Sequence, residues 1–264
     1  MVSTAKQHIV DGDIFQVVLS NRFEATFEGS LLNSYRTLRT TNPSPYMFFI
    51  KYSNLEITGA SPETLIKLQD GELSTFPIAG TASRGKNEEQ DNEFMQTLLE
   101  DEKELSEHNM LVDLSRNDLG KISEYGSVAV KDYLKVLKFS HVMHITSTVT
   151  GKLRKGLNQL DAITAALPAG TLSGAPKIRA CEIINDLEST KRGVYGGAIG
   201  YIDFTGNMDM CIAIRMVVKK ENKVYVQVGA GIVADSVPEN EYDECQKKAR
   251  AVFETLELSE MEID

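Results

Sequence analysis

Short apolar runs separated by turn residues dominate the first third of the chain and predict β-strands. These runs cover residues 14–20, 46–52, 55–58, 65–68 and 72–76. Asp70-Gly71 separates the last two runs, and an Asp-Gly pair between apolar segments is a strong hairpin signal. The pattern therefore predicts an antiparallel meander in this region and not a parallel sheet.

Helical periodicity occurs between and after these runs. It predicts helices over residues 4–11, 31–39, 161–167, 178–187 and 239–256, and one long helix over residues 93–118. In the long helix Leu98, Leu105 and Val112 recur every seven residues, which is typical of a buried helical stripe. Gly120 follows this stripe and is a suitable helix stop.

The second half of the chain predicts further strands over residues 127–130, 142–149, 198–204, 208–218 and 224–228. We expect residues 208–218 to form one strand that pairs with both 198–204 and 224–228. Arg215 stands within this apolar run. An arginine buried without a partner costs on the order of several kcal/mol, so the pattern predicts a negatively charged group beside Arg215.

Composition excludes several classes of function. The 264 residues are 42% hydrophobic and 25% charged, which is ordinary for a globular protein. The net charge of −10 argues against a nucleic-acid partner. No apolar run is long enough to span a membrane and no signal peptide precedes the first helix, so we expect no membrane association and a cytoplasmic location. The three cysteines, which form no CxxC pair, are expected to be reduced: Cys181, Cys211 and Cys245.

Two segments carry candidate chemistry. Residues 168–177 place glycines and prolines before the helix over 178–187, so free backbone N–H groups there could hold an anion such as a substrate carboxylate. A plain loop before a helix is the alternative. On the last helix Glu241, Glu244 and Lys248 share one face, which suits a divalent ion and an anionic ligand. The alternative there is a solvated acidic face with a Glu244–Lys248 ion pair.

A series of short motifs, each weak alone, becomes specific in combination. In chain order the motifs are Asp11–Gln16, Gly59–Glu63, Pro77–Thr81, Glu107–Asp113, Arg116–Gly120, Pro168–Lys177, Gly196–Gly197, Gly229–Gly231 and Glu241–Lys248. Together they resemble the catalytic core of the chorismate-utilising enzymes, and within them the anthranilate synthase component I family. The resemblance runs from about Ala5 to Leu256, which is nearly the whole chain.

The resemblance implies a fold and an activity. The fold would be α+β, with two large, mainly antiparallel sheets packed face to face and helices outside, in a single catalytic domain over residues 1–264. The activity would be the Mg²⁺-dependent conversion of chorismate and ammonia to anthranilate and pyruvate, a step of tryptophan biosynthesis. In this family a separate glutamine amidotransferase subunit supplies the ammonia. One alternative releases aminodeoxyisochorismate before pyruvate loss; another is a truncated fragment that binds chorismate or the amidotransferase without turnover.

The resemblance also assigns binding residues. Glu107 and Glu244 would hold Mg²⁺, with Glu241 close by or bridged through water, and the ion would bind the ring carboxylate of chorismate. Lys248 would lie beside that carboxylate. The enolpyruvyl carboxylate would be held by Tyr195, Arg215 and the backbone of Gly229, Ala230 and Gly231.

Catalytic roles follow from the same resemblance. Glu63 would act as the general acid that protonates the leaving C4 hydroxyl, which requires a carboxyl kept protonated near neutral pH. His144 would serve the second half-reaction, loss of pyruvate and aromatisation. Thr81 is assigned to the catalytic residues and lines the site together with Gly80.

Two positions distinguish reactions within the resembled family. Relatives that add water at C2 have a lysine where this chain has Gln16, and relatives that make aminodeoxychorismate have a lysine where it has Ala79. Glutamine cannot act as a base to activate water, and alanine cannot attack C2 covalently. The resemblance therefore implies a nucleophile that needs no activation by a residue at either position, and ammonia is such a nucleophile.

Members of the resembled family are usually longer chains. We expect a preceding portion to be missing here, which in the family contributes strands and half of a tryptophan feedback site. Residues 42–47 resemble the other half of that site. The resemblance therefore implies weakened tryptophan inhibition and an exposed surface where the preceding portion would pack.

Overall fold

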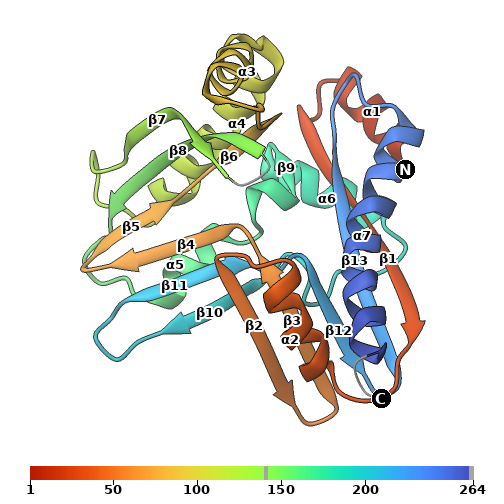
Figure 1. Ribbon diagram of the computed structural model, residues 1–264. Coiled ribbons are helices and arrows are strands. Elements are labelled where there is room, and N and C mark those ends of the chain that lie inside the picture. The colour runs from red at the N-terminus through yellow and green to blue at the C-terminus, as the bar shows by residue number, and fades with distance from the viewer. Residues whose placement is uncertain (140–141, 262–264) are drawn as a thin grey trace. The chain divides into compact units, whose positions relative to one another are not determined.

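The computed structural model describes residues 1–139 and 142–261 (Figure 1). The chain forms two compact units, each assembled from separate segments. The first unit comprises Met1–Glu63, Thr171–Ile199 and Cys211–Asp264, and the second comprises Thr64–Gly170 and Gly200–Met210. The expectation of one catalytic domain over residues 1–264 stays a prediction.

A six-stranded sheet is the frame of the first unit. Its order is β2–β3–β12–β13–β1–β9, and every neighbouring pair is antiparallel. The strands are β1 (Gln16–Thr26), β2 (Tyr46–Tyr52), β3 (Leu55–Ser61), β9 (Gly174–Ala175), β12 (Met216–Lys220) and β13 (Lys223–Ile232). The β1–β13 pairing runs from Val17 opposite Ile232 to Thr26 opposite Lys223, so the start of β1 lies beside the end of β13.

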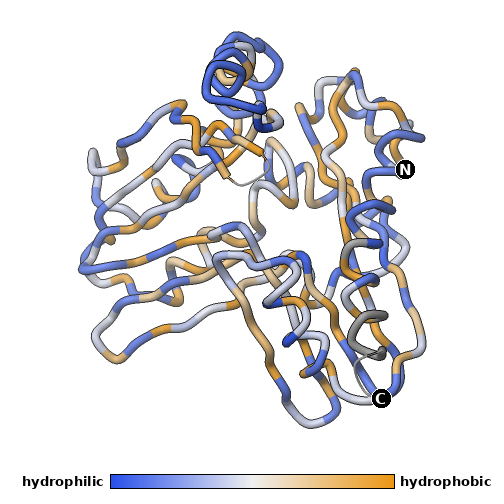
Figure 2. Tube along the Cα trace, viewed as in Figure 1, coloured by the Kyte–Doolittle hydropathy of each residue, from blue (hydrophilic) through white to orange (hydrophobic). Residues whose placement is uncertain are grey.

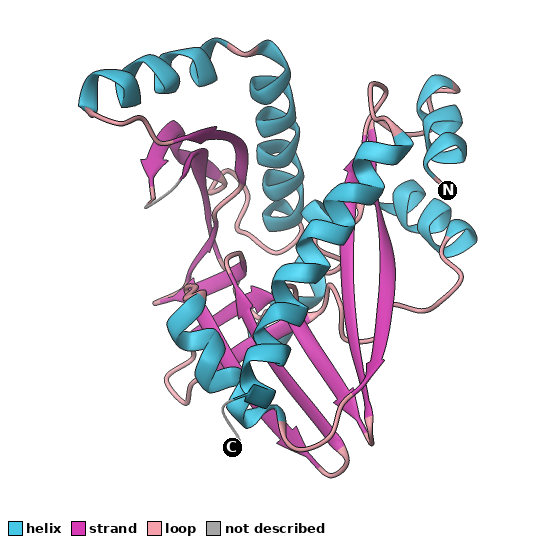
Figure 3. Ribbon diagram, turned by 45° about the vertical axis from the view of Figure 1, so that its right-hand side comes forward, coloured by secondary structure: helices cyan, strands magenta, loops and turns pink. Residues whose placement is uncertain are grey.

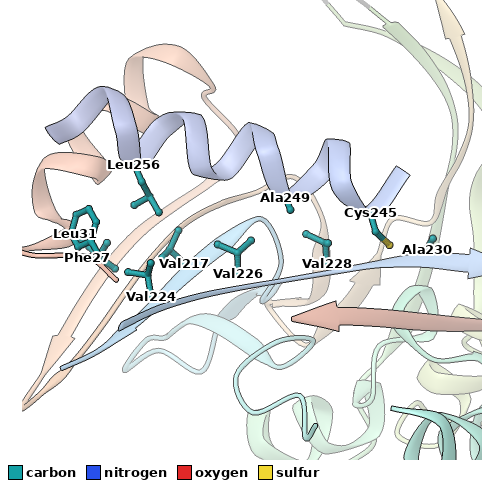
Figure 4. Packing of buried hydrophobic residues seen from close by; sticks show 10 residues of the cluster. All are labelled: Phe27, Leu31, Val217, Val224, Val226, Val228, Ala230, Cys245, Ala249 and Leu256. Carbon is teal, nitrogen blue, oxygen red and sulfur yellow. The ribbon is translucent and has the colours of Figure 1, made fainter. Parts of the chain in front are cut away.

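Four helices belong to the first unit: α1 (Val2–Val10), α2 (Leu31–Thr41), α6 (Lys177–Leu187) and α7 (Pro238–Met261). Figure 3 shows α7 crossing the strands of the six-stranded sheet. The core beneath α7 consists mainly of side chains from β12, β13, α2 and α7 (Figure 4): Phe27, Leu31, Val217, Val224, Val226, Val228, Ala230, Cys245, Ala249 and Leu256. A second core joins α1 and α6 to β1 through residues such as Ala5, Val17 and Ile183.

Most of a seven-stranded sheet belongs to the second unit. Its order is β10–β11–β4–β5–β8–β6, and β7 also pairs with β8. The strands are β4 (Thr64–Gln69), β5 (Glu72–Thr75), β6 (Ile78–Ser83), β7 (Ala129–Lys138), β8 (Val142–Lys152), β10 (Ala198–Ile202) and β11 (Met208–Ile212). The pairings of β5 with β4 and of β8 with β5, β6 and β7 are antiparallel. The two sheets confirm the predicted α+β class and its mainly antiparallel strands.

The helices of the second unit are α3 (Glu88–Glu100), α4 (Glu102–Gly120) and α5 (Gln159–Ala166). Most of α3 is hydrophilic (Figure 2), and its buried Leu98 packs against Met143 and Ile145 of β8. Across the described residues of both units, no helix is both long enough and apolar enough to cross a membrane.

The predicted long helix over residues 93–118 is wrong, because it is two helices. The chain breaks at Asp101, whose side chain caps α4 by accepting hydrogen bonds from the N–H groups of Lys103 and Glu104, at 2.9 and 3.1 Å. The seven-residue recurrence survives the break because Leu98 of α3 and Leu105 of α4 pack into the same cluster. The seven-residue apolar pattern therefore indicates that the two helices share a core, and it does not require a continuous helix.

The predicted strand over residues 208–218 is also wrong, because it is divided between the two sheets. β11 ends at Ile212 and β12 begins at Met216. Between them Arg215 has a φ of 48°, a left-handed conformation that a non-glycine strand residue does not adopt. The Arg215 side chain is exposed, which corrects the prediction that it is buried within an apolar strand.

Leu31 and Leu32 provide a matched test of the α7 core. Leu31 is 0% exposed and its neighbour on α2, Leu32, is 46% exposed. Leu31→Ala is expected to destabilise the first unit by about 2–5 kcal/mol, since it leaves a cavity in a packed core. Leu32→Ala is expected to change stability by less than about 1 kcal/mol. Urea unfolding followed by circular dichroism measures both, and equal losses would contradict the described packing.

Candidate active site

Glu63 follows β3 and its backbone is fixed on both sides. The Glu63 carbonyl accepts a hydrogen bond from the Ile212 N–H at 3.0 Å. Ser61 Oγ accepts from the Glu63 N–H at 3.4 Å and donates to the Ile212 carbonyl at 2.7 Å. The loop between β3 and β4 is therefore tied to the end of β11, and the Glu63 side chain starts from a well-defined position.

The surroundings of Glu63 favour its neutral form. Burial raises the pKa of the Glu63 carboxyl above its ordinary value, while the nearby Thr171 hydroxyl and Arg215 guanidinium lower it without cancelling the effect of burial. Burial also raises the pKa of the Tyr195 phenol. A carboxyl that holds its proton at higher pH is suited to donate that proton to a poor leaving group.

Two glycines of β13 leave room beside polar side chains of the first unit. A Cβ on Gly231 would lie 2.5 Å from Gln16 Nε2, and a Cβ on Gly229 would lie 2.9 Å from the Tyr195 hydroxyl. Both distances are too short for a side chain at these positions. Ala230, which was also assigned to the substrate, points its side chain into the α7 core. The side chains of Gln16 and Tyr195 therefore each approach β13 at a glycine.

Two buried polar atoms of this region, Gln16 Oε1 and Thr171 Oγ1, make no hydrogen bond of ordinary geometry within the described chain. Gln16 is 8% exposed. Buried polar groups nearly always have a partner, so such atoms call for a polar ligand. Thr171 was not singled out from the sequence, although it belongs to the loop over residues 168–177 that was. The sequence thus indicated the loop, but only the fold shows that Thr171 affects Glu63.

Lys248 links α7 to the glycines of β13. Its ammonium donates a hydrogen bond to the Gly229 carbonyl at 3.0 Å and forms an ion pair with Glu244 at 2.5 Å. This is the Glu244–Lys248 pair that the sequence offered as an alternative to a ligand site. Glu241 is half-buried on the same helix and Glu244 is exposed. Glu241, Glu244 and Lys248 thus lie in the first half of α7, where Lys248 contacts the Gly229 carbonyl.

The second unit brings together another group of predicted residues. His144 Nδ1 lies 2.9 Å from the Gly80 carbonyl and 3.1 Å from Thr81 Oγ1. Because a carbonyl only accepts hydrogen bonds, Nδ1 carries the hydrogen in this arrangement and Nε2 presents a lone pair. The histidine is thereby oriented as a proton acceptor through Nε2.

Glu104 is a further residue of this group that sequence reasoning missed. A Cβ on Gly80 would lie 3.3 Å from Glu104 Oε2, and Gly80 has a φ of +72° that favours glycine. Glu104 precedes Glu107 by one helical turn on α4, so their i, i+3 spacing was the signal available in the sequence. Ala79, the neighbour of Gly80, is buried.

The predicted site residues divide between the two units. The first contains Gln16, Glu63, Tyr195, Arg215, Gly229, Ala230, Gly231, Glu241, Glu244 and Lys248, and the second contains Ala79, Gly80, Thr81, Glu107 and His144. Over residues 1–139 and 142–261, no group of three or more His, Cys, Asp or Glu residues is arranged to hold a metal ion. Since Glu107 belongs to a different unit from Glu241 and Glu244, the magnesium set stays a prediction.

Comparison with known proteins gives consistent matches. The family described as chorismate binding enzyme matches residues 1–254. Component 1 of anthranilate synthase from Acetivibrio thermocellus is 54% identical over 256 residues, covering 97% of this chain and 52% of the relative. The same component from Aquifex aeolicus is 52% identical over 260 residues, covering 98% of this chain and 53% of the relative. The chain thus spans about half the length of the curated relatives it matches.

Solved structures agree with these sequence matches. Anthranilate synthase component I from Streptococcus pneumoniae superimposes with a TM-score of 0.88 at 51% identity, covering 95% of this chain and 56% of that one. The menaquinone-specific isochorismate synthase from Escherichia coli superimposes with a TM-score of 0.85 at 25% identity, covering 97% of this chain and 59% of that one. These matches confirm the resemblance that the motifs indicated.

The raised pKa of Glu63 has a consequence for stability. Between the ordinary glutamate pKa of 4.5 and the raised native pKa, the folded chain binds more protons than the unfolded chain, so the free energy of unfolding falls as pH rises. A glutamine at this position cannot titrate. Glu63→Gln is therefore expected to gain stability relative to the parent as pH rises from 4.5 towards the raised native pKa of Glu63, as measured by urea unfolding at each pH.

Glu56 provides the control of opposite sign. Burial raises its pKa, but hydrogen bonds from Lys51, the Leu31 N–H and Ser30 outweigh burial and leave the pKa below its ordinary value. The stability that this carboxylate contributes is present above pH 4.5 and is lost as pH falls through the native pKa. Glu56→Gln is expected to lose stability relative to the parent near neutral pH. The same pH trend for both variants would contradict the assigned shifts.

Proposed function

Since the chain belongs to the family of chorismate-binding enzymes, we propose that it binds chorismate and converts it, with ammonia, to anthranilate and pyruvate for tryptophan biosynthesis. The observation that carries the proposal is the Glu63 carboxyl, whose pKa is raised by burial and which faces Arg215 and Thr171. The names of the relatives, which are component 1 of anthranilate synthase, support this choice of product.

The first half-reaction exchanges a hydroxyl for an amino group. Ammonia attacks C2, both ring double bonds shift by one position, and the bond between C4 and its oxygen breaks. Hydroxide leaves poorly, so Glu63 gives its proton to this oxygen, which departs as water, and the new ammonium group at C2 then loses a proton. A carboxyl with an ordinary pKa would hold no proton near neutral pH, so the burial of Glu63 supports this role.

Carboxylate binding in the first unit fits Arg215 and the β13 glycines. The Arg215 guanidinium is exposed and can therefore form a forked pair of hydrogen bonds with a ligand carboxylate. Gly229 and Gly231 allow a ligand to approach the backbone where any side chain would collide. The Tyr195 hydroxyl beside Gly229 adds a neutral donor, because burial keeps the phenol protonated.

Ammonia is the proposed nucleophile because the two positions that distinguish reactions within the family, Gln16 and Ala79, supply no nucleophile of their own. Gln16 has no basic group to activate water, and the buried Ala79 has no group that can attack the ring. A glutamine amidotransferase subunit is the proposed source of ammonia, consistent with relatives named as one component of a synthase. We place this reaction in the cytoplasm.

The second half-reaction removes pyruvate and makes the ring aromatic. A base takes the proton from C2, the ring becomes aromatic, and the bond between C3 and the enolpyruvyl oxygen breaks. The enolpyruvate that leaves takes up a proton and becomes pyruvate. His144 Nε2 is the proposed base, because Nδ1 is committed to the Gly80 carbonyl. Release of aminodeoxyisochorismate would be the outcome if this step did not occur.

Magnesium is proposed as the cofactor. Carboxylate oxygens are the protein ligands that Mg²⁺ prefers, and Glu107, Glu241 and Glu244 would hold it. When bound, the ion supplies positive charge that binds the ring carboxylate of chorismate. Lys248 lies next to Glu244 and would contribute to the same positive region.

Turnover tests the general acid. With chorismate, Mg²⁺ and an ammonium salt, the chain is expected to produce anthranilate, which is detected by its fluorescence. Glu63→Gln is expected to reduce this rate by about 100- to 10,000-fold, as for loss of a positioned acid, with little change in chorismate affinity. Normal turnover in this variant would rule out the acid role of Glu63. Chorismate binding without turnover by the parent chain would favour the non-catalytic fragment.

Removal of the metal tests the carboxylates. EDTA is expected to abolish anthranilate formation, and excess Mg²⁺ is expected to restore it. Glu244→Gln is expected to raise the Mg²⁺ concentration needed for half-maximal rate by at least about 10-fold, because it removes a charged oxygen ligand. Glu254→Gln, an exposed position on the same helix, is the matched control and is expected to match the parent. Identical Mg²⁺ dependence in both variants would contradict the assignment of Glu244.

A further inference from the structure

A glutamate and an arginine outside the predicted motifs form an enclosed ion pair in the first unit. Glu188 follows the last residue of α6 and its side chain is 5% exposed, while that of Arg192 is 18% exposed. Arg192 Nε and one terminal nitrogen donate to the two carboxylate oxygens at 3.0 and 2.6 Å. Ser20 adds its N–H and hydroxyl, each at 2.8 Å. Glu188 is thus fully paired and holds the guanidinium in one orientation.

The remaining donors of Arg192 reach two backbone segments. One terminal nitrogen donates to the Leu172 carbonyl at 2.5 Å, and the other donates to the Val18 carbonyl at 2.7 Å. The guanidinium also lies over the Tyr195 ring, 5.8 Å from its centroid, which is a favourable cation–π geometry. One side chain therefore connects the loop at Leu172, strand β1 and the Tyr195 ring.

Each of these three connections leads to a residue of the proposed site. Leu172 is bonded to Thr171, whose hydroxyl lowers the pKa of the Glu63 carboxyl. Val18 lies two residues after Gln16 on β1, and its N–H donates to the Ser173 carbonyl at 2.8 Å. The Tyr195 hydroxyl abuts Gly229. No contact between Arg192 and Glu63 is needed for Arg192 to influence them all.

We propose that Arg192, anchored by Glu188, is a positioning residue that holds Thr171 beside Glu63 and Tyr195 beside Gly229. The inference rests on the proposed function only in calling these residues a site, because the contacts themselves are independent of any reaction. Arginine suits the role better than lysine, since a planar fork of donors can bond a carboxylate and two carbonyls in fixed directions. An ammonium group is a point charge and cannot reproduce that geometry.

The proposal makes the titration of Glu63 a readout of Arg192. The ionisable groups that face Glu63 in the described part of the first unit are Arg215 and Tyr195, and the Thr171 hydroxyl also lowers its pKa. If Arg192 holds Thr171 in place, loss of Arg192 releases that hydroxyl, and the pKa of Glu63 rises. A role in folding stability alone would leave the pKa of Glu63 unchanged in the folded fraction.

A double-mutant cycle tests this coupling. The Glu63 carboxyl is titrated by carbon-13 NMR in glutamate-labelled protein, with Glu63→Gln used to assign its signal. Thr171→Val and Arg192→Gln are each expected to raise the pKa of Glu63, and the double variant is expected to show the same shift as Thr171→Val alone. An unchanged pKa in Arg192→Gln, or shifts that add in the double variant, would overturn the proposal.

Control variants keep the result decisive. Arg179→Gln removes a more exposed arginine of α6 that pairs with Asp13 and Glu182, and it is expected to leave the titration of Glu63 unchanged. If Arg192→Gln does not fold, Arg192→Lys is used in its place. This variant keeps the positive charge beside Glu188 but lacks the planar set of guanidinium donors. A raised Glu63 pKa in Arg192→Lys supports the proposal, and a parental value overturns it. The titration requires no turnover, so absence of anthranilate formation would not affect this outcome.

Discussion

The pairing of β1 with β13 is the constraint on which the first unit depends. Its register places Val18 opposite Gly231 and Ser20 opposite Gly229, so the residues around the proposed ligand site are set by backbone hydrogen bonds. The same two strands provide core side chains on their other face. The β1–β13 pairing therefore determines which side chains face the site, because side chains alternate between the two faces of a strand with a period of two.

Burial of polar groups at this site opposes stability. The Glu63 carboxyl is held where its charged form is disfavoured, and Gln16 Oε1 and Thr171 Oγ1 make no hydrogen bond of ordinary geometry within the described chain. Unpaired buried polar atoms cost about 1–3 kcal/mol each. The core under α7 and the fully paired Glu188 offset that cost nearby. Such a site is stable only because the surrounding framework determines the position of each group.

The sequence predicted local elements well where a turn signal and an apolar run coincided. The strand over residues 46–52 has the predicted bounds, and the Asp70-Gly71 hairpin forms between β4 and β5. The sequence-based predictions of one long helix and one long strand failed at Asp101 and Arg215, where a side-chain cap and a left-handed φ interrupt an apolar pattern. Motifs identified Glu63 and the β13 glycines. The Glu188–Arg192 pair has a local i, i+4 spacing, but the bonds from Arg192 to Leu172 and Val18 join segments far apart in sequence, so no local pattern could predict them.

Alternation along β13 explains how one strand serves both core and site. Val228 and Ala230 point into the core beneath α7, whereas Gln227, Gly229 and Gly231 face Ser20, Tyr195 and Gln16. A shift of one residue in register would place glycines in the core and Ala230 against Tyr195. Selection for the site and selection for the core therefore act on the same pairing. That is why glycines, which weaken an ordinary strand, occur here within a well-paired one.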